Sequence, residues 1–144
     1  MTEILFNSPP DGHVFKNPDL NLFRTLIFHG QSQYWNAGAG QALIELINQG
    51  EESLLALTFH QDMGFQVEVK LGDEPYFVCL GNGDFDNTVT VHVGGEPLLL
   101  PTKFFVTKQT TWDIVQYFCE TGQRNNDYQW ASVEELNWHY GRQQ

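Results

Sequence analysis

The chain has 144 residues, with 18 acidic residues against 7 basic ones and a formal net charge of −11. This length fits one domain with a substantial core, and a hydrophobic content of 41% with abundant Phe, Tyr and Trp excludes an intrinsically disordered chain. The scarcity of Lys and Arg argues against direct binding to DNA or RNA, and no apolar run approaches the roughly 20 residues that a membrane span needs.

The start of the chain and its two cysteines bear on the compartment. The first residues, MTEILFNSPPDGH, lack the basic and long apolar regions of a signal peptide. Cys79 and Cys119 each sit in an apolar run, which favours buried free thiols over a disulfide or a metal pair. We therefore expect a cytoplasmic protein with a single domain over residues 1–144, loosely ordered at its ends, 1–16 and 139–144.

The first helix signal lies at residues 17–19, where Asn-Pro-Asp supplies a cap, a proline for the first helical position and an acid for the first turn. Gly30 can end this helix. The apolar residues that fall on one face between these limits are Leu20, Phe23, Leu26 and Ile27. Residues 41–49, QALIELINQ, fit either a helix face or a strand, and their short length favours a strand.

Strand signals dominate the middle of the chain. Residues 53–60 and 65–71 flank a four-residue turn that ends in glycine, which is typical of a hairpin. In the second of these runs apolar residues alternate with Gln66, Glu68 and Lys70, which predicts one face on a core and one face in water. Further strands are predicted at 75–80, 88–93 and 97–101, and all of these form an antiparallel meander.

The last third predicts a helix and a closing strand. Thr110 and Asp113 resemble a capping box, and Gly122 stands where a left-handed residue commonly ends a helix, so the helix spans 110–121. Residues 128–130, YQW, predict a short final strand. The expected fold class is α+β: an antiparallel meander sheet of about six strands with two helices packed against it. The residues predicted to form the buried face of this helix are Trp112, Val115, Phe118 and Cys119.

No catalytic or metal-binding constellation is visible in the sequence. The five histidines show no metal-ligand spacing, and the motifs of zinc deaminases, serine hydrolases and phosphate-binding loops are absent. The loop at 81–87, GNGDFDN, has calcium-type ligands but neither the spacing nor the closing Glu of an EF-hand, so a surface loop is the better interpretation. We expect no catalytic residues, no metal and no cofactor.

Aromatic and acidic residues offer two routes to binding. Aromatic pairs such as those at 34–35 and 104–105 could stack on bases, but without interleaved Lys and Arg they are better read as core and strand residues. Acidic residues gather at the predicted strand connections. They are Glu51, Glu52, Asp62, Asp73, Glu74, Asp84 and Asp86. Because alternate connections of a meander lie at the same edge of the sheet, some of these acids can form one negative patch; the alternative is that they are ordinary solvated turn residues.

Several segments together resemble a known family. The segments YWNAGAGQA, LTFHQDMGFQVEV and GGEPLLLP, and the helix that ends in ETG before the final aromatic strand, follow one another in a characteristic order between Tyr34 and Trp130. In that order and spacing the chain resembles the first-numbered family of immunity proteins of bacterial polymorphic toxin systems (Imm family one). The resemblance implies an α+β fold and the role of a cytoplasmic antidote to a secreted toxin domain, often a nucleic-acid deaminase. It implies no catalytic residues.

The acidic balance fits this role, because a toxin that acts on nucleic acid tends to carry a basic cleft. We therefore expect a monomer that forms a one-to-one complex with a cognate toxin domain and covers its active site. The residues expected to bind the toxin are Asp62, Asp73, Glu74, Asp84 and Asp86. Two alternatives remain open: a β-rich domain that binds a small ligand, which a large closed pocket would favour, and an enzyme that uses His60, Asp62 or His92, which a His–carboxylate pair in a cleft would favour.

Overall fold

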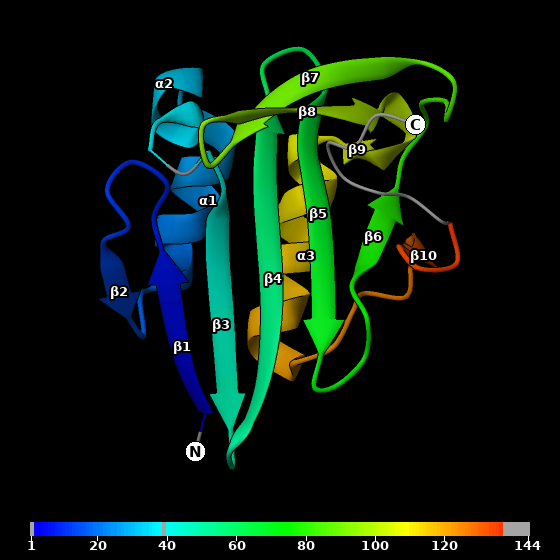
Figure 1. Cartoon of the computed structure of the whole chain (residues 1–144). Helices are drawn as coiled ribbons and strands as arrows, with labels where there is room; N and C mark the ends of the chain where they lie inside the picture. Colours follow the sequence, from blue (N-terminus) through cyan, green and yellow to red (C-terminus); the bar gives the residue numbers. More distant parts are fainter. Residues whose placement is uncertain (1, 39, 137–144) are drawn as a thin grey trace.

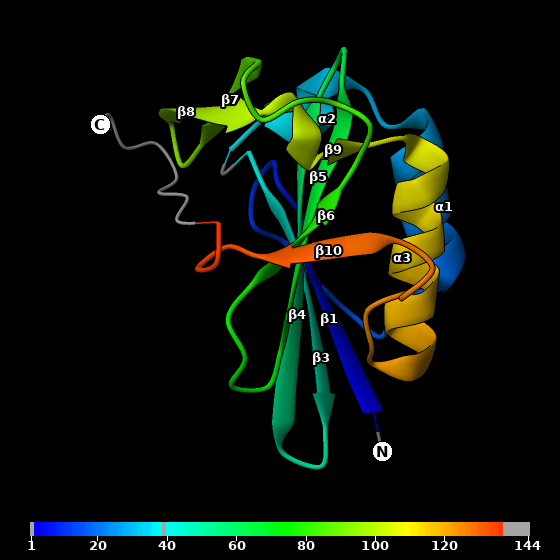
Figure 2. The ribbon, with the colours of Figure 1, turned by 90° about the vertical axis from the view of Figure 1, so that its right-hand side faces the viewer.

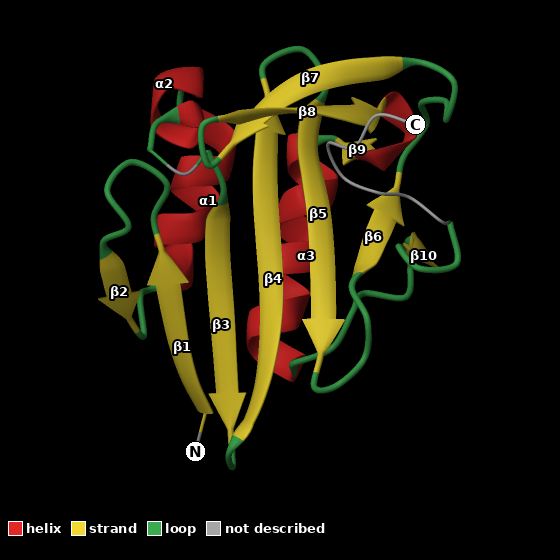
Figure 3. Cartoon of the chain, viewed as in Figure 1, coloured by secondary structure: helices red, strands yellow, loops and turns green. Residues whose placement is uncertain are grey.

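The structure is a computed structural model that describes residues 2–38 and 40–136 (Figure 1). It has the α+β fold expected from the sequence, with an antiparallel sheet and helices packed against it (Figure 3). The strands are β1 (Thr2–Asn7), β2 (Val14–Lys16), β3 (Ala42–Asn48), β4 (Glu51–His60), β5 (Gly64–Leu71), β6 (Phe77–Leu80), β7 (Thr88–Val93), β8 (Glu96–Pro101), β9 (Phe105–Val106) and β10 (Gln129–Ser132). The helices are α1 (Leu20–His29), α2 (Ser32–Asn36), the 3₁₀ turn η1 (Thr102–Phe104) and α3 (Lys108–Thr121).

Eight of the strands in the described part of the chain form one sheet, in the order β10-β6-β5-β4-β3-β1-β2, with β9 paired to β5. Every pair in this sheet is antiparallel. The ambiguous segment 41–49 forms a strand over Ala42–Asn48, as its length predicted, and residues 129 and 130 of the predicted final strand lie in β10. None of the helices among the described residues is long and apolar enough to cross a membrane.

The expectation of a loosely ordered N-terminus is wrong for residues 2–16. Strand β1 pairs with β3 over six residues, from Thr2 opposite Asn48 to Asn7 opposite Leu43. Its Phe6 is buried and meets Phe23 of α1 edge to face, with ring centroids 5.0 Å apart. The sequence before the proline-rich segment forms a strand, and its partner β3 lies much further along the chain, at residues 43–48. Residues 139–144, the other end expected to be loose, lie outside the described residues.

Helix α1 begins later than Asn17 predicted. Asp19 is the cap residue, and its side chain accepts a hydrogen bond from the Asn21 backbone amide at 2.9 Å. Asn17 instead has a positive φ of 47° and its Oδ1 accepts a hydrogen bond from the Ile4 backbone amide. Asn17 therefore holds the turn before the helix against β1, and Gly30 ends the helix as expected.

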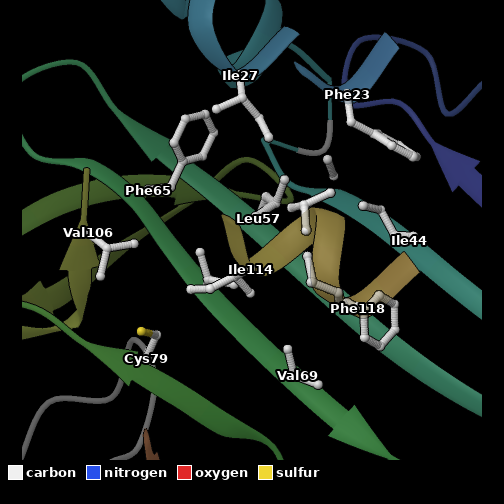
Figure 4. Close-up of a cluster of buried hydrophobic side chains, with 14 of the residues drawn as sticks. Phe23, Ile27, Ile44, Leu57, Phe65, Val69, Cys79, Val106, Ile114 and Phe118 are labelled. Carbon is white, nitrogen blue, oxygen red and sulfur yellow. The ribbon is translucent and has the colours of Figure 1, made fainter. Parts of the chain in front are cut away.

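The main core lies between the sheet and helices α1 and α3 (Figure 4). Residues at alternate positions of the strands, such as Ile44, Leu57 and Val69, point to this side because side chains alternate between the faces of a strand. They pack against Ile114 and Phe118 of α3, both fully buried.

Helix α3 has the predicted end but not the predicted start. Gly122 has a left-handed conformation, with φ of 74°, and its amide donates to the Phe118 carbonyl. The helix begins at Lys108, two residues before the predicted start, and its cap is Thr107 rather than Thr110: the Thr107 hydroxyl accepts a hydrogen bond from the Thr110 backbone amide at 3.1 Å. The motif that resembled a capping box therefore lies inside the first turn.

The prediction that β7 and β8 continue the meander is wrong. They pair only with one another among the described strands and form a separate two-stranded sheet. Figure 2 shows this hairpin on the side of the main sheet opposite α1 and α3, over its upper part only. A second core cluster forms beneath it, where Val91 and Leu100 of the hairpin meet Val78, Phe104 and Phe105. The meander thus ends at β6.

Candidate functional site

The two faces of the main sheet differ in what covers them. Helices α1 and α3 cover one face, and the other carries the β7–β8 hairpin at one end (Figure 2). We call the second the open face. Its residues include Glu45 on β3, Glu52 on β4 and Glu68 on β5, which alternate with the core residues of the same strands. Lys70 is the single Lys or Arg in these three strands.

A pocket of about 490 Å³ opens on this face, between the sheet, the hairpin and the segment after β10. We call it the open-face pocket. It is lined by Gln41, Leu43, Ala56, Thr58, Gln66, Glu68, Tyr76, Val93, Leu98, Leu100, Val133 and Glu134. The hairpin and Val133 supply apolar walls, and the strands supply a floor with several polar groups. A volume of this size is typical of binding sites.

The polar floor is built by cross-strand pairing. Thr58 of β4 lies directly opposite Gln66 of β5, and Glu68 follows two positions later on the same face. The Gln41 amide donates to the Thr58 hydroxyl at 3.5 Å, and the Gln66 amide donates to the Glu68 carboxylate. These hydrogen bonds align a hydroxyl, an amide and a carboxylate along the floor.

The floor residues of β5 are buried, which corrects the prediction that they face water. Gln66 is 1% exposed and Glu68 is 8% exposed. Their positions on the strand are those that the alternating pattern assigned to solvent, but the hairpin lies above them. Lys70, the third residue of that polar series, lies beyond the open-face pocket and remains partly exposed.

Tyr76 borders the same pocket just before β6. Burial raises the pKa of its phenol, and the negative charges of Glu68 and Glu52 raise it further. The hydroxyl is therefore protonated at neutral pH and available as a hydrogen-bond donor or acceptor at the pocket.

Gly40 explains how the hairpin can sit so close to the sheet. Its φ is +70°, and a Cβ there would lie 2.0 Å from the backbone oxygen of His92 on β7. A side chain at this position would push the hairpin away and would be strained in the left-handed region. The backbone contact at Gly40 thus helps to set the height of the pocket wall.

The acids predicted to bind a toxin fall at opposite ends of the sheet. Asp62 lies in the β4–β5 turn, and the loop that carries Asp84 and Asp86 lies at the same end (Figure 1). Asp73 and Glu74 lie in the β5–β6 connection at the other end. There Asp73 lines one shallow pocket with Glu51 and Glu52, so alternate connections do share an edge.

The loop at 81–87 is held by hydrogen bonds within it and to residues Thr102 and Lys103. The Asp84 backbone amide donates to the Thr102 hydroxyl at 2.9 Å, and the Lys103 amide donates to the Asp84 carbonyl at 3.0 Å. The Asp84 carboxylate accepts from the Asn87 side chain at 2.9 Å. Between the two acids, Phe85 is 47% exposed and packs edge to face on Phe104.

Glu74 differs from the other predicted residues because it already has a cationic partner. Its carboxylate lies 2.8 Å from Arg124, whose guanidinium also stacks over the Phe77 ring at 4.1 Å. This pair ties the β5–β6 connection to the segment before β10. Much of the charge of Glu74 is therefore compensated within the chain.

The histidines considered as catalytic residues lie together, and among the described residues neither forms an ion pair with a carboxylate, which the enzyme alternative would need. His60 and His92 line one shallow pocket at the end of the sheet. The His60 Nδ1 accepts a hydrogen bond from the backbone amide of Asp62 at 3.1 Å, so this nitrogen faces the main chain rather than the carboxylate. Within residues 2–38 and 40–136, no group of three or more His, Cys, Asp or Glu is placed to hold a metal ion.

Sequence reasoning missed the open-face pocket, although one signal pointed to it. In residues 54–59, LLALTF, both faces of the strand carry small or apolar residues, which is typical of a strand covered on both sides. Ala56 and Thr58 are the residues of this run that face the pocket. Both side chains are uncharged, which is consistent with a position on the part of the open face that the hairpin covers.

Comparisons with known proteins add no relative. No protein-family model matches the chain, and neither a curated protein nor a solved structure matches it.

Proposed function

We propose that this protein is a cytoplasmic immunity protein that binds a cognate secreted toxin domain and neutralises it by covering its active site. The toxin is expected to act on nucleic acid, for example as a deaminase. The resemblance between residues 34 and 130 supports this role, as does the lack of a catalytic motif in the sequence. The protein works by binding and has no enzymatic activity of its own.

The observation that carries the proposal is the acidic open face. Three adjacent strands place Glu45, Glu52 and Glu68 on it against the single cation Lys70, in a chain with a net charge of −11. Part of this face lies beyond the hairpin (Figure 2). An extended, negatively charged sheet surface suits a partner whose own surface is basic.

A basic cleft is what a nucleic-acid-directed toxin needs to hold phosphates. An acidic protein can occupy such a cleft in place of the substrate. Electrostatic attraction raises the rate of encounter toward about 10⁸–10⁹ M⁻¹s⁻¹ at low salt, which matters when a single free toxin molecule does damage. Acids at both ends of the sheet, including Asp62 and Asp73, extend the negative field beyond the open face.

The test is protection in cells. The toxin domain encoded in the reading frame next to this gene is expressed with and without the protein, and survival is counted. Survival only in the presence of the protein is the expected result. Equal death in both cultures contradicts the proposal, provided that both proteins are detected in the lysate.

A second candidate function is the binding of a small ligand, and the volume of the open-face pocket favours it. Its apolar walls and few polar groups fit the usual composition of ligand sites. The pocket opens to solvent, whereas the ligand alternative called for a closed one. A rise in the melting temperature of the isolated protein with one compound of a metabolite panel, and failure to protect cells, would favour this function.

A further inference from the structure

We propose that Phe85, on the loop between β6 and β7 (Figure 1), is an apolar anchor that enters a pocket of the bound toxin domain. This inference rests on the proposed function, because it takes the toxin domain as the partner. It goes further by naming the residue that holds the complex together and the kind of surface that receives it. That surface is an apolar pocket with Lys or Arg at its rim.

Phe85 differs from the other phenylalanines of the chain in its exposure. The chain has 11 phenylalanines, and Phe85 alone is exposed, at 47%, while the others are buried or partly buried. A ring left in water forgoes the stabilisation that burial provides, and a partner that covers it recovers this free energy. A single exposed apolar side chain is common on protein surfaces, and what sets Phe85 apart is how it is held.

The β6–β7 loop is fastened at both ends to the segment that contains η1. At its start the Gly81 amide donates to the Lys103 carbonyl at 2.8 Å, and at its end the Asn87 carbonyl accepts from the Thr102 amide at 2.7 Å. Between them the Asp84 amide donates to the Thr102 hydroxyl at 2.9 Å. The course of the loop is therefore set before a partner binds, which lowers the entropy lost on binding.

The ring itself rests on the protein core. Phe85 packs edge to face on Phe104, with ring centroids 6.1 Å apart, and Phe104 is fully buried in the second core cluster. Gly83, two residues earlier, has no room for a side chain, because a Cβ there would lie 2.5 Å from the Thr102 backbone. About half of the Phe85 surface is thus held against the protein, and the rest is presented to solvent.

The residues on either side of Phe85 define the charge of the partner. Asp84 and Asp86 are exposed, and neither forms an ion pair within the described part of the chain. The Asp84 carboxylate accepts from the uncharged Asn87 side chain at 2.9 Å and keeps its charge. Two carboxylates beside an apolar ring attract a basic surface and repel an acidic one. A second copy of this chain, with its net charge of −11, is therefore disfavoured, whereas a basic toxin domain fits.

An uncharged recess lies beside the same loop. A pocket of about 470 Å³ is walled in part by residues 81–83, and its apolar lining includes Met63, Leu80, Phe105 and Val106. Its described lining carries no charged side chain. A partner that covers the loop can therefore bury apolar surface beside the ring as well as over it, as the core of a protein interface does.

Phe85 and its flanking acids are expected to act on different rates. Exposed charges steer the encounter and act on association, while an aromatic anchor that loses its water in the complex governs dissociation. Phe85 is thus expected to slow dissociation of the complex with little effect on its formation.

The first experiment measures the binding kinetics of the purified toxin domain from the neighbouring reading frame. Phe85→Ala removes the ring and keeps both flanking charges. We expect dissociation to become at least about 30-fold faster, with the association rate changed less than threefold, because loss of an anchor acts on dissociation. Tyr117→Ala is the matched control, since Tyr117 on α3 is also an exposed aromatic residue, at 39%, and it should behave as wild type.

A dissociation rate for Phe85→Ala within threefold of wild type overturns the inference, while protection of cells by the wild type leaves the proposed function intact. Equal acceleration in Tyr117→Ala also overturns it, because the effect would then not be specific to the loop. If the wild type neither binds the toxin domain nor protects cells, the inference falls together with the proposed function.

A second experiment does not depend on how well Phe85→Ala folds. The photoreactive residue p-benzoyl-L-phenylalanine replaces Phe85, or Tyr117 as the control, and the complex with the toxin domain is irradiated. We expect a covalent adduct with the toxin domain from position 85 and none from position 117. A complex that forms without an adduct from position 85 overturns the inference. An adduct between two copies of this chain in the absence of toxin assigns the ring to self-association and overturns it as well.

Discussion

At the scale of single residues, the buried face of α3 is turned slightly from the one that the sequence predicted. Val115 and Phe118 are buried as expected, but Trp112 and Cys119 are only partly buried, and Thr111 and Ile114 take their places. Phe118→Ala is therefore expected to cost about 3–5 kcal/mol of unfolding free energy, as a fully buried ring does. Trp112→Ala should cost less, about 1–2 kcal/mol.

Chemical denaturation followed by far-UV circular dichroism measures both values. The two variants share one helix, so they control for changes in helix propensity and in the slope of the transition. If Trp112→Ala destabilises the protein as much as Phe118→Ala, the assignment of the helix face is wrong.

The two thiols predict a dependence of stability on alkaline pH. Burial raises the pKa of Cys79 and of Cys119 from 9.0 to about 12. In the unfolded chain both thiols lose their protons near pH 9, while in the folded protein they keep them until about pH 12. Ionisation then favours the unfolded state, so the unfolding free energy should fall as pH rises from 9 to 12 and should not depend on these thiols below pH 9.

Denaturation curves of wild type and of the double variant Cys79→Ala/Cys119→Ala, recorded at several pH values, test this. The raised pKa values of Tyr34, Tyr76 and Tyr128 act in the same direction and remain in the variant. We expect a shallower decline in the variant. An equally steep decline would mean that the thiols do not titrate between these limits.

At the scale of elements, α3 offers a test of where a helix begins. Thr107 accepts a hydrogen bond from the Thr110 amide and is the cap, whereas Thr110 was the predicted one. Thr107→Ala should therefore cost about 1 kcal/mol of unfolding free energy, the usual effect of losing a threonine cap. Thr110→Ala should change stability by less than half of that in the same assay, and the reverse order would restore the predicted start.

The β7–β8 hairpin shows why the predicted meander ended early. Its inward residues Val91 and Leu100 need an apolar surface, and the neighbours of β5 provide one through Val78 on β6 and Phe105 on β9. If the hairpin had instead paired with the edge of the sheet, these side chains would have buried less apolar surface. Contacts of Asp84 with Thr102 and Lys103 also hold the loop before β7 against η1.

At the scale of the whole molecule, the charge distribution predicts how the partner is found. Reversing both Asp84 and Asp86 to Lys should slow association with the toxin domain by about 10-fold at low ionic strength and have little effect at high salt, because exposed charges are screened. Glu74 is left unchanged, since its reversal would repel Arg124. Stopped-flow mixing at two salt concentrations measures the rates.

The control carries the same change of net charge elsewhere: Glu120→Lys with Asp127→Lys, both exposed and near the C-terminal end of α3. It should slow association less than the change at 84 and 86. Equal slowing by the two pairs would show that only net charge matters. If protection and both rates are unchanged in the loop variant, the toxin binds elsewhere on the molecule.

The sequence by itself determined most of the elements, because the causes are local. The strand at 65–71, the turn at 61–64 and the left-handed end at Gly122 each depend on a few neighbouring residues, and all three are found in the structure. The α+β class followed from them. The N-terminal strand was missed because its pairing with β3 joins residues that are far apart in the chain.

Only the tertiary structure decided the candidate site. Gln66 and Glu68 have the pattern of solvent-facing residues, and Asp73 and Asp84 have the pattern of acids that could share a patch. Which of them is covered depends on where the hairpin folds over the sheet, and which lie at opposite ends depends on how the strands are connected. Burial of a polar side chain is a property of what packs above it, and a local pattern carries no information about a segment some 25 residues further along the chain.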